Sequence, residues 1–493
     1  MVAGAALCVI ISMTLQVPQL ATSAYMVFFI SKESKLLTTI TGVGGVIVLT
    51  IGIGATLLLY KFTYGHPELR IPGMAIALFL GMWLSRVLVI GPLGFLLGFV
   101  VAVSQSVGEE IPSPELLVRG LLWLWVALAY AIALTVVLNL LFLPDTPKAA
   151  ARPKPKSLFV PDAFTNPAHV HFALKVTFAA MFCYIVYEAI DWSGIHTAFI
   201  TCTFIALEST GATFHKGVLR IVGCLIGGAL ALFTIVFLMP HMDTIASLVV
   251  VVACASAIAG WVATGTELIS YAGLQIAFAF FYSVFQGYAP DTDLDNVRNR
   301  VVGILFGLIV TGLVFRYIWP EHTIDRLRAA LRQALQQLAR LLELPGSDVS
   351  IEKGKAEADT LLAETSKSFE QARRYADLTV FEFEKSPAGG RMAVENTEGT
   401  LSRAERLFVT ATSLFSDHAL DEWQQLPQAA RIAESELRNA VAKRIERVAA
   451  SDELEDARTN LSTAFARWTE TMQALQVKNS RVALVSQIVT EVQ

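Results

Sequence analysis

The stretch Leu36–Tyr60 reads LLTTITGVGGVIVLTIGIGATLLLY and contains no charged residue. It is longer than the roughly 20 residues that an α-helix needs to cross the hydrocarbon core of a bilayer. Further uncharged stretches of comparable length occupy Val87–Gly108, Gly120–Pro144 and Leu268–Pro290. The sequence therefore predicts an all-α polytopic membrane protein.

The composition agrees with a membrane protein but hides two different parts. Hydrophobic residues make up 54% of the 493 residues, charged residues only 16%, and the formal net charge is -4. Apolar runs dominate as far as Trp319, whereas residues of both charges recur every few positions in Glu321–Gln493. We expect the second part to be a helical domain outside the membrane.

The apolar segments predict about twelve transmembrane helices, six before and six after a linker. A single tilted helix across Pro18 is the alternative to the first two segments. The segments are Val2–Val17, Leu20–Ile30, Leu37–Tyr60, Ile71–Leu84, Val87–Ser104, Leu117–Leu143, His171–Ile190, Gly194–Leu207, Gly217–Leu238, Thr244–Val262, Leu268–Gln286 and Val301–Trp319.

The two sets of six segments indicate a duplication. Gly42, Gln105 and Arg119 match Gly223, Gln286 and Arg300 at one constant sequence offset. Because each half has an even number of segments, both copies share one orientation, which makes them parallel repeats. We expect the first repeat in residues 1–144, a linker in 145–169, the second repeat in 170–320 and the helical domain in 321–493.

The linker sets the expected orientation. Lys and Arg near the ends of membrane spans stay in the cytoplasm. The linker is rich in proline and carries Lys148, Arg152, Lys154 and Lys156, which predicts that it and the C-terminal domain are cytoplasmic. Two acidic loops then lie outside, and their residues are Glu109, Glu110, Glu115, Asp291, Asp293 and Asp295.

Ionisable and aromatic polar groups cluster in the second half and are the candidates for a substrate or proton pathway, because charge at membrane depth is costly. Simpler interpretations remain open for each: snorkelling of a lysine, solvated interface residues, a structural histidine, or basic residues that only set topology. The candidates are Lys175, Glu188, Asp191, Trp192, His196, Glu208 and Arg220.

Small residues spaced four apart predict close helix packing. Arg220 is followed by Gly223 and Gly227, and the same spacing relates Gly94 to Gly98 and Gly303 to Gly307. Gly42 is the counterpart of Gly223 in the first half. We interpret these glycines as packing positions.

The C-terminal part predicts a helical bundle. In His322–Leu344, leucines recur at helical spacing, and Pro345 follows. Further breaks at Pro387–Gly390, Pro427 and Ser451–Asp452 predict four more helices. We expect this domain to mediate oligomerisation.

Several chemistries lack a sequence signal. All five cysteines lie in apolar segments without metal-ligand spacing, so we expect free thiols and no metal. No P-loop, nucleophile elbow or metalloprotease motif is present. We therefore expect neither an enzyme nor a cofactor, and no nucleic-acid partner.

Short motifs carry a resemblance to a known family. The stretches Asp162–Pro167, Ala173–Lys175, Asp191–Thr197 and Leu219–Gly223 resemble the fusaric acid resistance (FUSC) and aromatic acid exporter family. Ile10–Thr14 before Pro18, and Trp319–Glu321, resemble the first and last spans of its members. Two departures are the absence of a charged segment before the first span and the short linker between the halves.

The resemblance implies an exporter of aromatic acids, drugs or related amphipathic compounds in the bacterial inner membrane. It implies two partners, a periplasmic membrane fusion protein and an outer-membrane channel, and it adds Thr197 to the candidate positions. We expect proton-driven export. A passive organic-anion channel, as in the related plant malate channels, and a membrane scaffold without transport are the alternatives.

Overall fold

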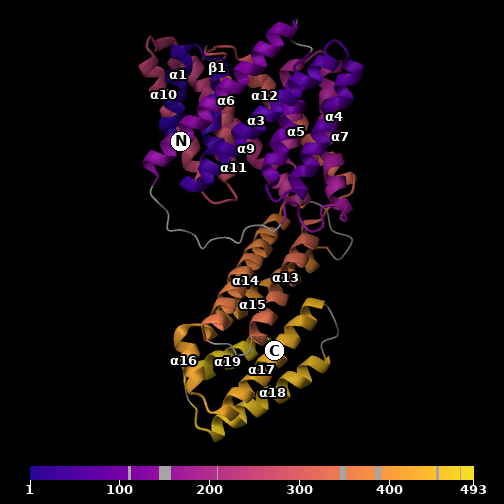
Figure 1. Ribbon diagram of the computed structural model, residues 1–493, viewed down its shortest axis with the longest axis vertical. Helices are drawn as coiled ribbons and strands as arrows, with labels where there is room; N and C mark the ends of the chain where they lie inside the picture. Colours follow the sequence, from indigo (N-terminus) through magenta and orange to yellow (C-terminus); the bar gives the residue numbers. More distant parts are fainter. Residues whose placement is uncertain are drawn as a thin grey trace. The chain divides into compact units, whose positions relative to one another are not determined.

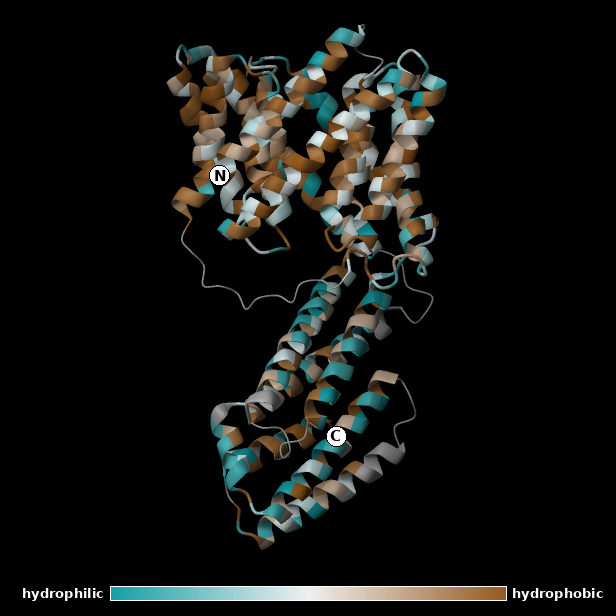
Figure 2. Ribbon diagram, in the orientation of Figure 1, coloured by the Kyte–Doolittle hydropathy of each residue, from teal (hydrophilic) through white to brown (hydrophobic). Residues whose placement is uncertain are grey.

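The computed structural model describes residues 1–108, 111, 113–143, 157–207, 209–344, 351–382, 390–450, 455–477 and 479–492. The chain forms two compact units. The first comprises Met1–Glu208 and Thr213–Pro320, and the second comprises Ser209–Ala212 and Glu321–Gln493. Hydrophobic residues dominate the helices of the first unit, and hydrophilic residues recur along those of the second (Figure 2).

The helices of the first unit coincide with the predicted apolar segments. Seven of those in the described residues are long and apolar enough to cross a membrane, and shorter apolar helices lie between them. The helices are α1 (Val2–Leu15), α2 (Leu20–Ile30), α3 (Lys35–Thr63), α4 (Pro67–Val87), α5 (Gly91–Ser106), α6 (Pro114–Phe142), α7 (Pro167–Ala189), η1 (Ser193–Ile195), α8 (Thr197–Ile205), α9 (Thr210–Phe233), η2 (Thr234–Leu238), η3 (Met239–His241), α10 (Ile245–Ala263), α11 (Ser270–Val284) and α12 (Asp295–Tyr317). The chain is therefore an all-α polytopic membrane protein.

Local backbone signals set several of these boundaries. Gln16 and Gln19 both have positive φ, so α1 and α2 are separate helices rather than one tilted helix across Pro18. Asn166 caps α7 by accepting a hydrogen bond from the Ala168 amide at 3.0 Å. Between α11 and α12, Phe285–Gln286 (β1) and Ala289–Pro290 (β2) form a short antiparallel hairpin with Gly287 at its turn.

Several of the predicted helix starts were too late, and α9, for example, begins at Thr210 rather than at Gly217. Helix α6 begins at Pro114 and α12 at Asp295, so Glu115 and Asp295 lie in first helical turns rather than in loops. The charged residues at these ends were assigned to loops, but an acidic residue is favourable in a first turn. Glu109, Glu110 and the linker lysines and arginine lie outside the described residues.

Helices of the first half pack against helices of the second half within the first unit. Figure 1 shows α1 beside α10 and α4 beside α7, and both pairs are in contact. Helix α2 likewise contacts α11, and rings of α5 contact α8 through Phe204. Each half therefore contributes to one shared junction.

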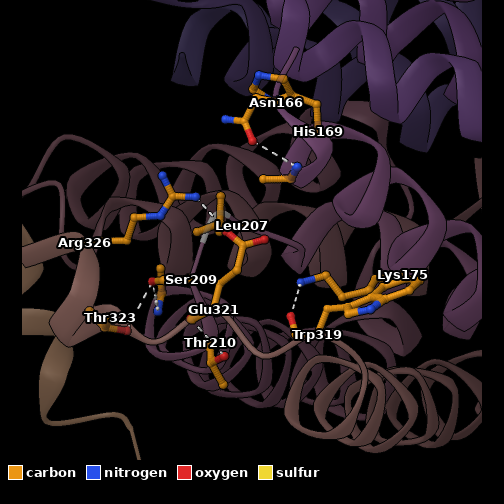
Figure 3. A network of polar contacts seen from close by, with 12 residues as sticks. Asn166, His169, Lys175, Leu207, Ser209, Thr210, Trp319, Glu321, Thr323 and Arg326 are labelled. Atoms are coloured by element: carbon orange, nitrogen blue, oxygen red, sulfur yellow. Dashed lines mark hydrogen bonds and ion pairs between the residues drawn. The ribbon is translucent and has the colours of Figure 1, made fainter. Parts of the chain in front are cut away.

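The second unit is a helical bundle around one apolar core. Its helices are α13 (Thr323–Glu343), α14 (Ile351–Thr379), α15 (Gly390–Leu414), α16 (Asp417–Gln425), α17 (Gln428–Ala450), α18 (Glu455–Ala474) and α19 (Ser480–Val492). The prediction of four helices after α13 was wrong, because Ser416 caps the short α16 and a left-handed Gln476 separates α18 from α19. Within this unit Thr210 donates to the Glu321 carbonyl, and Thr323 donates to Ser209 (Figure 3).

Helices α4 and α5 pack with their backbones in contact at two glycines. A Cβ built on Gly81 would lie 2.6 Å from the Cα of Gly98. We expect Gly98→Leu to lower the apparent melting temperature of the detergent-solubilised protein, since overpacking costs about 1–3 kcal/mol. Gly54→Leu is the control, because a Cβ at Gly54 meets nothing within 4 Å. Equal melting temperatures for the two variants would contradict the close packing.

Candidate functional site

A cavity of about 480 Å³ lies where the two halves of the first unit meet. Its wall comes from α2, α3, α5 and α6 in the first half and from α8, α11 and α12 in the second. Most lining residues are apolar or aromatic, and the polar ones include Gln19, Thr22, His196, Thr197 and Arg300. Its size and lining are those of a site for a small organic molecule. We call it the arginine cavity.

Arg300 is the charged group of this cavity. It lies in the second turn of α12 and is only 7% exposed. Its guanidinium carbon is 4.8 Å from the ring centre of Phe278 and 4.9 Å from that of Tyr282. Its Nε and Nη1 atoms are buried without a hydrogen-bond partner among the described residues.

A buried guanidinium without hydrogen-bond partners is suited to bind an anion. Burial of a charged group without hydrogen bonds is costly, and cation–π contacts offset only part of that cost. A carboxylate brought by a ligand would accept the free N–H groups and form the short charge-assisted hydrogen bonds typical of arginine. The cavity therefore has the charge and the apolar walls for an organic anion.

Arg220 on α9 has a different environment. It is 2% exposed, and its Nε donates to Thr201 Oγ1 at 3.0 Å. Its Nη1 donates to Gln275 Oε1 at 2.9 Å and to the Tyr271 hydroxyl at 3.2 Å. These bonds tie α9 to α8 and α11, so Arg220 positions the helices around the cavity.

Three aromatic side chains separate the arginine cavity from a second one of about 270 Å³. Tyr25, Phe29 and Phe204 line both cavities, and we call them the aromatic constriction. The Phe204 ring centre lies 4.9 Å from that of Phe99 and 5.4 Å from that of Phe95. The second cavity contains Lys216, and we call it the lysine cavity.

The structure brings three of the predicted site residues to this junction. His196 and Thr197 line the arginine cavity, and Arg220 lies behind its wall. His196 Nδ1 is 3.2 Å from the Ser193 carbonyl, and Thr197 is buried with its hydroxyl 3.5 Å from the Arg300 carbonyl. Lys216, which was not among the predicted site residues, lines the lysine cavity.

The other predicted residues are not among the described residues that line either cavity. Lys175 is buried in α7, where its Nζ donates to the Trp319 carbonyl at 3.0 Å (Figure 3) and lies 4.8 Å from the Phe315 ring centre. Trp192 donates from Nε1 to Asn299 Oδ1 at 3.2 Å. Asp191 is exposed at a turn with positive φ, and Glu188 is half-buried near the end of α7. Glu208 lies outside the described residues.

The motif stretch before α7 serves that helix. Asn166 Nδ2 donates to Asp162 Oδ2 at 2.9 Å while its oxygen caps α7. This hydrogen bond from Asn166 holds the pKa of the exposed Asp162 carboxyl below its ordinary value. The stretch therefore fixes the start of α7 and contributes no group to either cavity.

The glycines chosen for packing lie at helix contacts. A Cβ on Gly223 would meet Gln275 of α11, and one on Gly227 would meet Ile276 and Ala279 of α11. Gly303 and Gly307 face the backbone of Ile195 and Ala198, and Gly42 faces Val136 of α6. Gly223 thus brings α11, with Gln275, against the helix that carries Arg220.

Sequence reasoning missed Arg300 as a site residue, and it missed the aromatic residues entirely. Arg300 served only as a marker of the repeat, because the last apolar segment was started at Val301. The signal was present, since Asp295–Arg300 continues the helical pattern into that segment. Phe29, Phe204 and Phe278 gave no signal, because phenylalanine is an ordinary residue in an apolar span.

Fold and cavity together define a polytopic helical membrane protein with a ligand-sized site between its halves. Residues 181–314 match the family described as fusaric acid resistance protein-like. The chain is 36% identical over 203 residues to the multidrug resistance protein MdtO of Shigella flexneri, a match covering 41% of this chain and 30% of the relative. MdtO of Escherichia coli O157:H7 is also 36% identical, and that of strain K12 is 35% identical, each with 29% of the relative covered.

The region from residue 181 to residue 314 is therefore a fusaric acid resistance protein-like domain, and the predicted family resemblance is confirmed. That region carries His196, Thr197, Arg220 and Arg300. The chain spans about 30% of the length of the curated relatives that it matches.

Proposed function

We propose that this protein exports aromatic acids, drugs or related amphipathic organic compounds across the inner membrane of a bacterium. The observation that carries the proposal is Arg300, a buried guanidinium with free N–H groups among aromatic rings. The matched relatives are named multidrug resistance proteins, which supports export. Among the described residues that line the two cavities there is no carboxylate or thiol, which favours transport over catalysis.

We infer that the membrane unit consists of two parallel repeats of six helices. The support is that equivalent helices of the two halves make equivalent contacts. The first helix of each half, α1 or α7, contacts the fourth helix of the other half, α10 or α4. The second helix of each half, α2 or α8, contacts the fifth helix of the other half, α11 or α5. Parallel repeats place a substrate site at their interface. The arginine cavity occupies that interface.

The aromatic constriction favours a carrier over the alternative, a passive organic-anion channel. Tyr25, Phe29 and Phe204 separate the two cavities, so a ligand passes only when these side chains move. Movement of this kind limits the rate for each molecule, whereas an open channel gives large unitary currents. Electrical recording from reconstituted protein separates the two: large unitary currents would establish the channel.

Removal of the Arg300 charge tests the substrate class. Cells that express the protein should accumulate less naphthoate than control cells. Arg300→Gln should abolish most of this difference, with a loss of about tenfold or more in export rate, because a charge-assisted hydrogen bond contributes ~1.5–3 kcal/mol. Naphthamide, which has the same rings and no charge, should be affected far less.

Arg298→Gln is the matched control, because Arg298 is exposed in the same helix and pairs with Asp295 at 3.1 Å. It should leave naphthoate export unchanged. We propose that export is proton-driven, with His196 as the cavity residue that carries the proton. A protonophore should then abolish export, and His196→Gln should reduce its protonophore-sensitive part. Naphthoate export that persists in Arg300→Gln would refute the proposed substrate class. Naphthoate export that persists with the protonophore would refute proton coupling.

The orientation of the chain is also a proposal. The basic linker supports a cytoplasmic location for the linker and for residues 321–493. Protease added to right-side-out spheroplasts should leave the second unit intact, whereas protease added to inside-out vesicles should cleave it. Cleavage of the second unit in spheroplasts would show that the orientation is opposite to the one proposed.

We propose that the exporter works with a periplasmic membrane fusion protein and an outer-membrane channel, as the family resemblance implies. A membrane-impermeant cross-linker applied to the cell envelope should couple the chain to a periplasmic protein, since only its external loops are then accessible. Full export in cells from which the cross-linked protein has been deleted would exclude a tripartite system.

A further inference from the structure

The lysine cavity has the same combination of groups as the arginine cavity. Its lining includes the rings of Phe95, Phe172 and Tyr271 together with the half-buried Lys216. The Lys216 ammonium is 4.9 Å from the ring centre of Tyr271. Apolar rings around a single ammonium suit an aromatic molecule with one negative charge.

Shared neighbours connect Lys216 to Arg300. Lys216 precedes Arg220 by one turn of α9, and Tyr271 contacts both: its ring lies against Lys216, and its hydroxyl accepts from Arg220. Arg220 and Arg300 then share Phe278, at 5.7 Å and 4.8 Å from its ring centre. The three cations thus follow one another from the lysine cavity to the arginine cavity.

Protein carboxylates do not neutralise this series within the described part of the chain. The described partners of Lys216, Arg220 and Arg300 are aromatic rings and neutral oxygens, and neither cavity has an acidic residue in its described lining. Arg220 is hydrogen-bonded to neutral partners, so its charge also remains. A positive potential in an apolar site of low dielectric attracts an anion on both sides of the aromatic constriction.

We propose that the lysine cavity is a second binding site for the same aromatic carboxylate, with Lys216 as its counter-ion. This inference rests on the proposed function. The anion binds beside Lys216, the aromatic constriction opens, and the carboxylate passes to Arg300 while the ring stays among aromatic side chains. Lys216 and Arg300 are the binding residues, and Arg220 maintains the potential between them.

Calorimetric titration of the purified full chain in lipid nanodiscs with naphthoate tests this. Wild-type protein should bind two equivalents. Lys216→Gln should bind one, with affinity at the lost site lowered by about tenfold or more, and Arg300→Gln should also bind one. Lys216→Arg should restore two equivalents. Lys61→Gln is the matched control, because Lys61 is exposed on α3 and lines neither cavity, and it should bind two.

A steric variant makes the test independent of Lys216. Leu274 lines the lysine cavity, so Leu274→Trp should fill it and leave one equivalent. One equivalent in the wild type that is lost in Arg300→Gln and unchanged in Lys216→Gln and Leu274→Trp would refute the second site and retain the proposed function. No naphthoate binding by the wild type would refute the proposed function itself.

Discussion

The cost of burying positive charge among apolar helices governs the first unit. Arg220 and Arg300 both lie at the junction of the two halves, yet they meet that cost differently. Arg220 donates from Nε and Nη1 to neutral oxygens of Thr201, Tyr271 and Gln275, so its hydrogen bonds join three helices, and only its Nη2 has no partner among the described residues. Arg300 has aromatic rings and free N–H groups. One arginine therefore holds the site together, and the other leaves its hydrogen-bonding capacity for a ligand.

Aromatic rings stabilise these buried cations without neutralising their charge, which carboxylates could not do. An acidic partner would stabilise Arg300 more strongly, but it would cancel the charge and occupy the N–H groups that an anion needs. A ring offers a smaller stabilisation of about 0.5–2 kcal/mol and accepts no strong hydrogen bond. Phe278 and Tyr282 thus pack against the guanidinium without occupying its N–H groups. The same rings supply apolar surface for an aromatic ligand, so affinity and charge selection come from one set of side chains.

The sequence predicted the existence of the apolar helices well, because the hydropathy of a segment depends only on residues that are neighbours along the chain. The apolar segment Thr244–Val262 coincides closely with α10, whereas α9 and α12 begin at Thr210 and Asp295, well before the predicted Gly217 and Val301. The site was harder to predict. A segment trimmed at its first charge excluded Arg300, and nothing in an apolar span distinguishes Phe204 at a constriction from a lipid-facing phenylalanine. In the second unit, α16 was missed because the preceding break is a serine cap without proline or glycine.

Charge at membrane depth is a useful signal, but it does not distinguish a pathway from a packing contact. Lys175 is as buried as Arg220, at 2% exposure, and was as strong a candidate from sequence. Its ammonium donates to the carbonyl of Trp319, just beyond the C-terminal end of α12, where helical carbonyls lack intrahelical partners and carry partial negative charge. That contact fastens α7 to α12. Because α12 also carries Arg300, Lys175 acts on the candidate site through the helix that it fixes.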